Sequence, residues 1–225
     1  MIANVQQYGQ VIVVDDASSD RTGAIAAQSG ALVKRNPINL QYDGALEVGL
    51  KTALDEGYEY AVTLDADGQH EARDILGLLA ALSQGADLVV GIRPEPARIA
   101  EAWFAMVGRW LWGLRDPLCG MKAYRLSWLE RYGTLGTHRS IGTELAIRML
   151  RDGAEVKQIP INIHSRRDRP RFGGSISANF KIMRALAFDV WHYSRLPKAS
   201  LHSESSHSLG AETGARPAVD TTKEI

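Results

Sequence analysis

Residues 62–70 read VTLDADGQH, and this stretch decides how the rest of the chain is interpreted. The apolar run 60–64 predicts a buried strand that ends at Asp65 and Asp67. Side chains alternate across a strand, so the two carboxylates share a face and repel each other unless a cation lies between them. Mg2+ or Mn2+ suits oxygen ligands of this kind and leaves positions for a substrate phosphate. The other interpretation is a polar strand-to-helix turn, in which Asp67 or His70 lies near the N-cap of the next helix.

Apolar runs alternate with amphipathic segments along most of the chain. Short continuous runs such as VIVV at residues 11–14 are typical of strands buried on both faces, and apolar side chains three or four residues apart predict helices. The predicted strands are residues 11–14, 31–34, 60–64, 87–92, 118–125 and 156–163, and the predicted helices are residues 21–29, 44–56, 71–84, 99–114, 141–151 and 176–193. This alternation predicts an α/β fold with a parallel sheet.

The composition is that of a globular protein without a strong electrostatic bias. Of 225 residues, 26 are Lys or Arg and 26 are Asp or Glu, so the net charge is zero and no overall basic field attracts nucleic acid. Cys119 is the single cysteine, which excludes an internal disulfide and fits a reducing compartment. We see no signal peptide and no apolar run of about 20 residues. We expect a cytoplasmic protein, with peripheral contact at the inner face of the membrane left open.

One domain followed by a tail is expected. Residues 1–197 carry the periodic pattern, whereas residues 198–225 are rich in Ser, Thr, Gly and charged residues and lack apolar periodicity. Such a segment cannot bury enough apolar surface to offset the entropy lost on ordering. The prediction is a globular domain over residues 1–197 and a disordered polar tail over residues 198–225.

Basic side chains gather in one predicted loop, residues 164–174. Arg166, Arg167 and Arg171 suit bidentate contacts with phosphate, although a solvated basic loop has the same composition. The helix that follows, residues 176–193, combines basic and aromatic side chains. It either lies in the headgroup region of a membrane or packs on the core.

Four motifs occur in order along the chain: VVDDASSDRT at 13–22, LDADGQH at 64–70, DPLCGMKAY at 116–124 and RFGGS at 171–175. Together they resemble family 2 glycosyltransferases with the GT-A fold, and the likeness extends over residues 11–186. It is closest to the branch that glycosylates polyprenyl phosphates, such as dolichyl-phosphate mannose synthase. The resemblance implies a mostly parallel sheet flanked by helices and a nucleotide-sugar-dependent enzyme.

The resemblance also implies roles for individual residues. Asp16 and Asp65 contact the nucleotide of a UDP- or GDP-linked donor, and Asp65, Asp67 and Gln69 hold Mg2+ or Mn2+ on its diphosphate. That metal neutralises charge on the departing nucleotide. The implied reaction is metal-dependent transfer of the sugar with inversion at its reacting carbon.

Catalytic candidates lie in the two later motifs. By the same resemblance, Arg166, Arg167 and Arg171 reach phosphate oxygens, and Arg171 is also a catalytic candidate. Asp116 is the other, as the base that a hydroxyl acceptor requires. A polyprenyl phosphate is already anionic and needs no base, and it is the acceptor we expect. The alternatives are a hydroxyl-directed glycosyltransferase and a truncated, non-catalytic GT-A-like domain.

Three positions depart from the family pattern. The family opens with a strand carrying an Ile-Pro-x-Tyr-Asn-Glu type motif, which residues 1–10 do not match, so we expect the first strand of the sheet to be absent. The glycines usual after Asn39 are Gln41 and Asp43 here, which changes the expected geometry of that loop. Ile176 stands where a lysine is usual, which weakens the expected phosphate clamp.

The remaining polar and aromatic candidates have simpler interpretations. The predicted helix 99–114 contains Trp103 and Trp110, which we interpret as core rather than as an acceptor groove. Glu144 is either a base or a solvated helix acid, and Cys119 is interpreted as a small buried hydrophobe.

Overall fold

The computed structural model describes residues 1–95, 98–132, 135, 140–164 and 175–193, and within the last range it describes the side chains of residues 182–191. Most of the predicted arginine loop and the whole predicted tail lie outside these residues.

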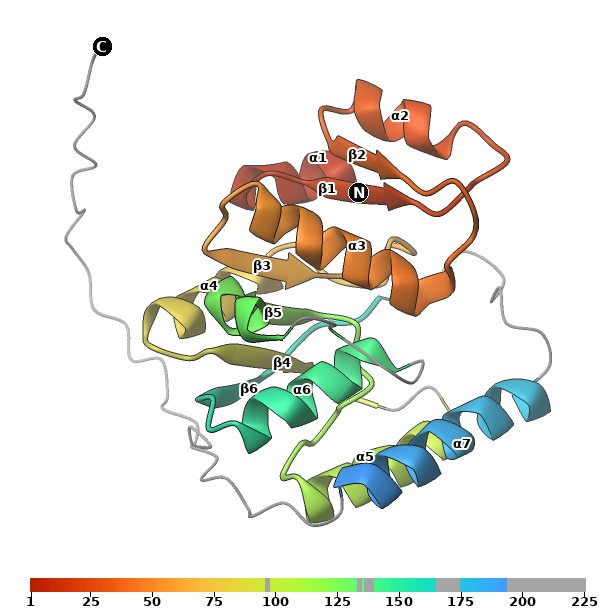
Figure 1. The fold of residues 1–225 in the computed structure, drawn as a ribbon, viewed down its shortest axis with the longest axis vertical. Helices are drawn as coiled ribbons and strands as arrows, with labels where there is room; N and C mark the ends of the chain where they lie inside the picture. Colours follow the sequence, from red (N-terminus) through yellow and green to blue (C-terminus); the bar gives the residue numbers. More distant parts are fainter. Residues whose placement is uncertain (96–97, 133–134, 136–139, 165–174, 194–225) are drawn as a thin grey trace.

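Six strands form two sheets that lie between helices (Figure 1). They are β1 (Ile12–Asp15), β2 (Leu32–Arg35), β3 (Tyr60–Thr63), β4 (Leu88–Ile92), β5 (Lys122–Arg125) and β6 (Val156–Pro160). β1 and β2 form a parallel pair, and the other four lie in the order β3-β5-β4-β6. β5 is antiparallel to both neighbours and β6 is parallel to β4, so three strands of the larger sheet share one direction. The predicted α/β fold is confirmed, and β5 is the strand whose direction departs from the parallel pattern.

No strand lies between β1 and β3 in the described part of the chain, and the two sheets are not hydrogen-bonded to each other. The residues before β1 form instead the short helix α1 (Ile2–Val5) and the 3-10 turn η1 (Gln6–Tyr8). Val5 belongs to the same hydrophobic cluster as Val11 and Val62, so this segment covers part of the junction between the sheets. The expectation that residues 1–10 do not supply a first strand is confirmed.

The helices pack on both sides of the sheets (Figure 1). The elements are α2 (Thr22–Gln28), α3 (Gln41–Asp55), α4 (Asp74–Ser83), α5 (Ile99–Leu111), the 3-10 helix η2 (Leu126–Arg131), α6 (Ile141–Arg151) and α7 (Ser175–Tyr193). α6 has the predicted bounds, and the ends of the other predicted helices shift by three residues or fewer. α5 and α7 pack side by side at the end of the molecule opposite α2. None of the described helices is long and apolar enough to cross a membrane.

The larger sheet divides the buried core into two parts. On one face Leu88, Val90 and Tyr124 pack with side chains of α3 and α6, and on the other Val89 and Ala123 pack with α4. All five side chains are fully buried. Because alternate residues of a strand point to opposite faces, β4 and β5 are buried on both faces.

Two elements begin three or four residues later than predicted because their first predicted residues hydrogen-bond elsewhere. β5 begins four residues late, since the Cys119 amide donates to the Asp116 carbonyl at 3.2 Å and turns the chain back. α4 begins three residues late, since the Glu71 amide donates to the Asn162 carbonyl at 3.4 Å. Both changes leave polar loops at the same edge of the larger sheet.

The aromatic helix α5 is only partly a core helix. Phe104 and Trp112 are buried, but Trp103 is 53% exposed and Trp110 is 74% exposed. The interpretation of Trp103 and Trp110 as core is therefore wrong. They are seven residues apart, so two turns of helix bring them to one face, away from the face of Phe104.

Candidate active site

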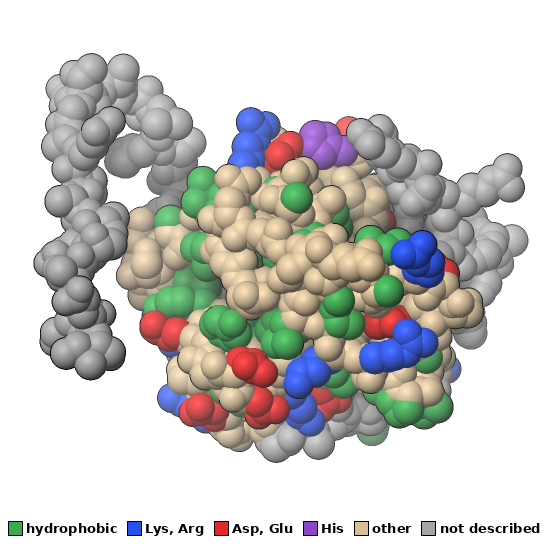
Figure 2. Space-filling model, turned by 90° about the horizontal axis from the view of Figure 1, so that it is seen from above, with side chains coloured by type: hydrophobic (Ala, Val, Ile, Leu, Met, Phe, Trp, Pro, Cys, Tyr) green, Lys and Arg blue, Asp and Glu red, His purple; other side chains and the backbone are tan. Residues whose placement is uncertain are grey.

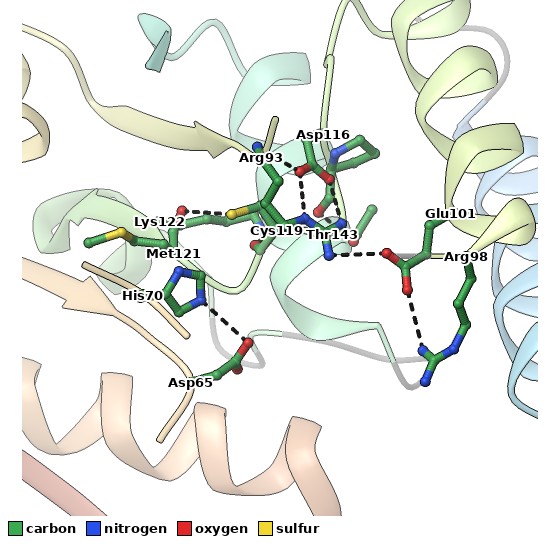
Figure 3. Close-up of polar contacts among 11 residues, drawn as sticks. Asp65, His70, Arg93, Arg98, Glu101, Asp116, Cys119, Met121, Lys122 and Thr143 are labelled. Atoms are coloured by element: carbon green, nitrogen blue, oxygen red, sulfur yellow. Dashed lines mark hydrogen bonds and ion pairs between the residues drawn. The ribbon is translucent and has the colours of Figure 1, made fainter. Parts of the chain in front are cut away.

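Polar residues meet at the carboxyl ends of β3 and β4, beside the amino end of the antiparallel strand β5. Asp65 follows β3, Arg93 follows β4, and Asp116 lies in the loop before β5. In Figure 3, Arg93 contacts Asp116, and Asp65 contacts His70 nearby. This edge is where open α/β sheets bind their ligands.

Asp65 is confined by its neighbours. Its side chain is 40% exposed, and its Oδ2 lies 3.6 Å from Nε2 of His70. A Cβ atom on Gly120 would overlap the Asp65 carboxylate, so only glycine fits beside it. Burial alone would raise the pKa of the Asp65 carboxyl, but His70, and then the charges of Lys122 and Arg93, hold it below its ordinary value. Asp65 is therefore held as a carboxylate at the sheet edge.

Asp67 and Gln69 form a tight turn after Asp65. The Gln69 amide donates to Oδ1 of Asp67 at 3.0 Å, and Gly68 between them has φ +76°, a left-handed conformation that favours glycine. We call residues 65–69 the acid turn. α4 begins at Asp74 with Arg73 at its N-cap and no side-chain cap, so neither Asp67 nor His70 caps this helix.

The acid turn is joined to the segment that follows β6. The His164 amide donates to the Gln69 carbonyl at 2.8 Å. The His164 ring also lies close to Glu71, two residues after the turn, with its Nε2 2.7 Å from Oε2 of Glu71. His164 is the last described residue before the predicted arginine loop, and Arg166 follows it by two positions in the sequence.

Asp16 follows β1, at the carboxyl end of the smaller sheet. Its Oδ1 accepts hydrogen bonds of 2.8 Å from the Asn36 side chain and from the Leu40 amide. Its neighbour Asp15 is buried instead, and hydrogen bonds from Ser18 lower the pKa of that carboxyl. Asp15 therefore stabilises the loop, and Asp16 remains the candidate nucleotide ligand.

Asp116 is clamped by Arg93. The Arg93 backbone amide, Nε and Nη2 donate to the two Asp116 oxygens at 3.1, 2.8 and 2.9 Å. Nη1 of Arg93 lies 3.0 Å from Oε2 of Glu101, whose other oxygen lies 3.3 Å from Nη1 of Arg98. Asp116 is 7% exposed. This geometry suits a residue that positions Arg93 better than it suits a base.

Lys122 places a buried ammonium group under the same loop. It is 4% exposed, and its Nζ donates to the Cys119 carbonyl. Burial lowers the pKa of Lys122, while the charges of Asp116 and Asp65 oppose that change. Cys119 is fully buried, as predicted, and burial raises the pKa of its thiol to about 11. The hydrogen bond from Lys122 to the Cys119 carbonyl therefore holds the loop before β5 in place.

Two helix acids serve the fold. Asp43 lies inside α3, and its Oδ1 accepts a hydrogen bond of 2.8 Å from the Ile141 amide at the start of α6. Glu144 is fully buried within α6, so the interpretation as a solvated helix acid is wrong.

Residues 6–133, more than half of the chain, match the model of glycosyl transferase family 2. The chain belongs to this family. Polyprenol monophosphomannose synthase of Mycolicibacterium smegmatis is 30% identical over 179 residues, which cover 69% of this chain and 67% of that protein. Undecaprenyl-phosphate mannosyltransferase of Micrococcus luteus is 31% identical over 177 residues, which cover 69% and 72%.

Solved structures agree with this assignment at the level of the fold. Glucosyl-3-phosphoglycerate synthase of Mycobacterium tuberculosis, in complex with Mn2+, UDP and glucosyl-3-phosphoglycerate, gives a TM-score of 0.67 at 18% identity. The match covers 88% of this chain and 75% of that chain. The GT-A fold is thus shown, and this family 2 member is a nucleotide-sugar-dependent glycosyltransferase.

The acid turn of this glycosyltransferase fits Mg2+ or Mn2+. Asp65, Asp67 and Gln69 offer oxygen donors, which these hard ions prefer. In the part of the chain that the structure describes, no three Asp, Glu, His or Cys side chains form a metal-binding group.

The fold brings some of the predicted site residues together. Asp65, Asp67, Gln69 and Asp116 lie at one edge of the larger sheet, and Asp16 lies at the end of the smaller one. Arg166, Arg167 and Arg171 lie outside the described residues. The sequence interpretation missed His70, Arg93 and Lys122. Arg93 directly follows a predicted strand and Lys122 lies in a recognised motif, and those positions were the available signals.

Proposed function

We propose that this glycosyltransferase transfers a sugar, with inversion, from a UDP- or GDP-linked donor to a polyprenyl phosphate in a reaction that depends on Mg2+ or Mn2+. The observation that carries the proposal is the link between the acid turn and His164. This link brings a turn of the metal-binding type next to His164, the residue that precedes a sequence rich in arginine. That combination suits a metal-bound diphosphate together with a second phosphate.

On the donor side, the acid turn would hold the metal and Asp16 would contact the nucleotide. Asn36 and the Leu40 amide orient the Asp16 carboxylate for that contact. The bound ion neutralises the charge that develops on the departing nucleoside diphosphate. The hydrogen bond from the His164 amide to the Gln69 carbonyl places His164 itself beside the acid turn.

We assign the phosphate contacts to the arginine segment. Arg166, Arg167 and Arg171 follow the anchored residue His164 in sequence. Each guanidinium can form two parallel hydrogen bonds with a phosphate group. Arg171 is the candidate for stabilising charge on the reacting phosphate.

On the acceptor side, Asp116 is poorly placed to act as a base, because both of its oxygens accept hydrogen bonds from Arg93. An acceptor hydroxyl must lose its proton to a base as it attacks, whereas a phosphate monoester is already anionic near neutral pH. The arrangement therefore favours a phosphate acceptor. Asp116 takes the role of holding Arg93 at the sheet edge.

A lipid-linked acceptor requires contact with a membrane surface, and α5 offers a suitable face. The α5 stripe is the set of apolar side chains exposed on one face at spacings of four, three and four residues: Ile99, Trp103, Met106 and Trp110. Exposed tryptophans that share a helix face are typical of peripheral membrane contacts. Trp191 of the adjacent helix α7 is 77% exposed.

The charges on α5 and α7 suit an anionic surface. Arg109 and Arg184 are exposed, whereas the acids Glu101 and Asp189 on the same helices are buried. Basic side chains beside an apolar face bind anionic lipid headgroups. Figure 2 shows the opposite end of the molecule, where acidic and basic side chains are interspersed. Membrane contact through α5 and α7 therefore fits the proposed acceptor.

The acceptor is tested with a panel of radiolabelled UDP- and GDP-sugars. With Mn2+, undecaprenyl phosphate should become labelled, EDTA should abolish labelling, and undecaprenol should remain unlabelled. NMR of the product with an α-linked donor should show a β linkage. Transfer only to hydroxyl acceptors would overturn the acceptor, and retention of configuration would overturn the stereochemistry.

The membrane face is tested separately by sedimentation with anionic vesicles. The double variant Trp103→Ser, Trp110→Ser should bind them more weakly, and Leu76→Ser, at an exposed apolar residue of α4, serves as the matched control. Equal binding by the double variant and the control would exclude the α5 stripe as the contact.

A further inference from the structure

His70 is a buried histidine whose two ring nitrogens have different surroundings. Its side chain is 4% exposed, and Nε2 faces the Asp65 carboxylate at 3.6 Å (Figure 3). Nδ1 is also buried, and among the described residues no group forms a hydrogen bond with it. The backbone of His70 forms an antiparallel bridge with Ile163, which fixes the place of the ring.

Packing alone does not explain a histidine at this position. A buried nitrogen without a hydrogen-bond partner destabilises the folded state. An apolar side chain of similar size would fill the same volume without that penalty. What an apolar side chain cannot supply is the contact between Nε2 and Asp65.

Asp65 is fixed on its other side by the loop before β5. Gly120 lies against the carboxylate with no room for a Cβ atom. The Thr63 hydroxyl donates to the Gly120 carbonyl at 3.0 Å, which holds this glycine in place. The Asp65 carboxylate therefore lies between the backbone of Gly120 and the imidazole of His70. Of these two residues, His70 is the one whose side chain can donate a hydrogen bond.

We propose that His70 is a positioning residue that donates from Nε2 to Asp65 and sets the orientation in which this carboxylate binds the metal ion. The inference rests on the proposed function, which assigns Asp65 to the metal. Metal ligands are commonly oriented by donors that do not touch the ion, and loss of such a donor weakens metal affinity by about 10- to 100-fold.

Three substitutions separate positioning from packing. His70→Leu fills the space without a donor. His70→Gln places an amide nitrogen near the position of Nε2, whereas the shorter side chain of His70→Asn reaches only to the position of Nδ1. Mn2+ affinity in the presence of UDP, and separately of GDP, is measured on the full chain by electron paramagnetic resonance of free Mn2+, and Tm is measured for each variant.

His70→Leu and His70→Asn should weaken Mn2+ binding about 10-fold or more, and His70→Gln should restore most of it. The Tm of His70→Leu should equal or exceed that of the wild type. If His70→Leu binds Mn2+ with wild-type affinity, whatever its Tm, the inference is overturned and the proposed function is not. Failure of the wild type to bind Mn2+ with either nucleotide overturns the proposed function and the inference together.

Discussion

The two sheets differ in how deeply they are buried. In β4, Leu88, Val89 and Val90 are fully buried. In β1 only Asp15 is buried, and the three residues before it are half-buried. β2, which pairs with β1 in the described part of the chain, changes from half-buried to exposed along its length. The larger sheet therefore holds most of the apolar core.

The candidate site is divided across this difference. The acid turn and the clamped pair Arg93 and Asp116 belong to the larger, well-buried sheet. Asp16 belongs to the smaller sheet, whose inner edge at β1 is not paired with β3. Segments with little buried apolar surface open locally at low free energy. We expect the metal side of the site to be rigid and the nucleotide side to open first.

The largest effect should come from an acid that is buried on α7, against the start of α6. Asp189 on α7 is fully buried, and burial followed by the charge of Glu144 raises its pKa to about 7. Between pH 4 and 7 the folded state keeps a proton that the unfolded chain has lost, so stability falls as pH rises, by on the order of 4 kcal/mol for about three pKa units. Asp189→Asn should remove this loss.

Urea unfolding of Asp189→Asn at pH 5 and pH 7 checks this prediction. The variant should be more stable than the wild type at pH 7, and its stability should change less between the two values. Asp55→Asn, at an exposed position of α3, should follow the wild-type profile. A wild-type stability that rises from pH 5 to pH 7 in parallel with Asp189→Asn would contradict the prediction.

Core substitutions test the comparison of the sheets directly. Leu88→Ala in β4 should lower the free energy of unfolding by about 2–5 kcal/mol, because it leaves a cavity in a fully buried site. Val13→Ala in β1 should cost about 1 kcal/mol, because that side chain is only half-buried. Urea denaturation measures both. Equal losses would show that the smaller sheet contributes as much to the core as the larger one.

The fold was largely predictable because burial imposes a period on the sequence. α6 has the predicted bounds, and its apolar residues Ile141, Leu145 and Met149 recur every four residues on a buried face. The direction of a strand leaves no mark on an apolar run, so the antiparallel β5 could not be predicted that way. The exposure of Trp103 was also missed, because the sequence does not show whether an apolar side chain on a helix packs in the core or lies on the surface.

The site was predictable where its residues are neighbours in sequence. Asp65 and Asp67 stand together in one motif, so the sequence alone places them in one segment. β3 ends at Thr63, so the two residues lie in a turn and the predicted shared strand face is not formed. Arg93 and Asp116 are 23 positions apart, and they meet because β4 and β5 pair side by side. Lys122 reads as an ordinary basic residue until the pairing of β5 shows that it is buried.

Nucleotide affinity tests whether the metal side and the nucleotide side of the site act separately. Asp67→Asn should lower the affinity for UDP or GDP in the presence of Mn2+ about 100-fold, roughly 2.7 kcal/mol, and leave the affinity without metal unchanged. Asp16→Asn should weaken binding by the same factor with and without Mn2+, because the proposed function assigns Asp16 to the nucleotide and not to the metal. Calorimetry with and without EDTA measures both. If Asp16→Asn weakens nucleotide binding only when Mn2+ is present, the metal side and the nucleotide side of the site act as one unit.

The smallest effect concerns the first residue of α3, on the lightly buried side. Gln41 has φ +64°, a left-handed conformation, at a position where the resemblance leads us to expect a glycine. A side chain with a Cβ atom is strained there by about 1–2 kcal/mol, while glycine is not, although glycine also gains freedom in the unfolded chain. Gln41→Gly should therefore raise the free energy of unfolding by up to about 1 kcal/mol. Gln41→Ala keeps the Cβ atom and should not, so equal stabilities of the two variants in urea would show that the left-handed backbone is not the source of strain.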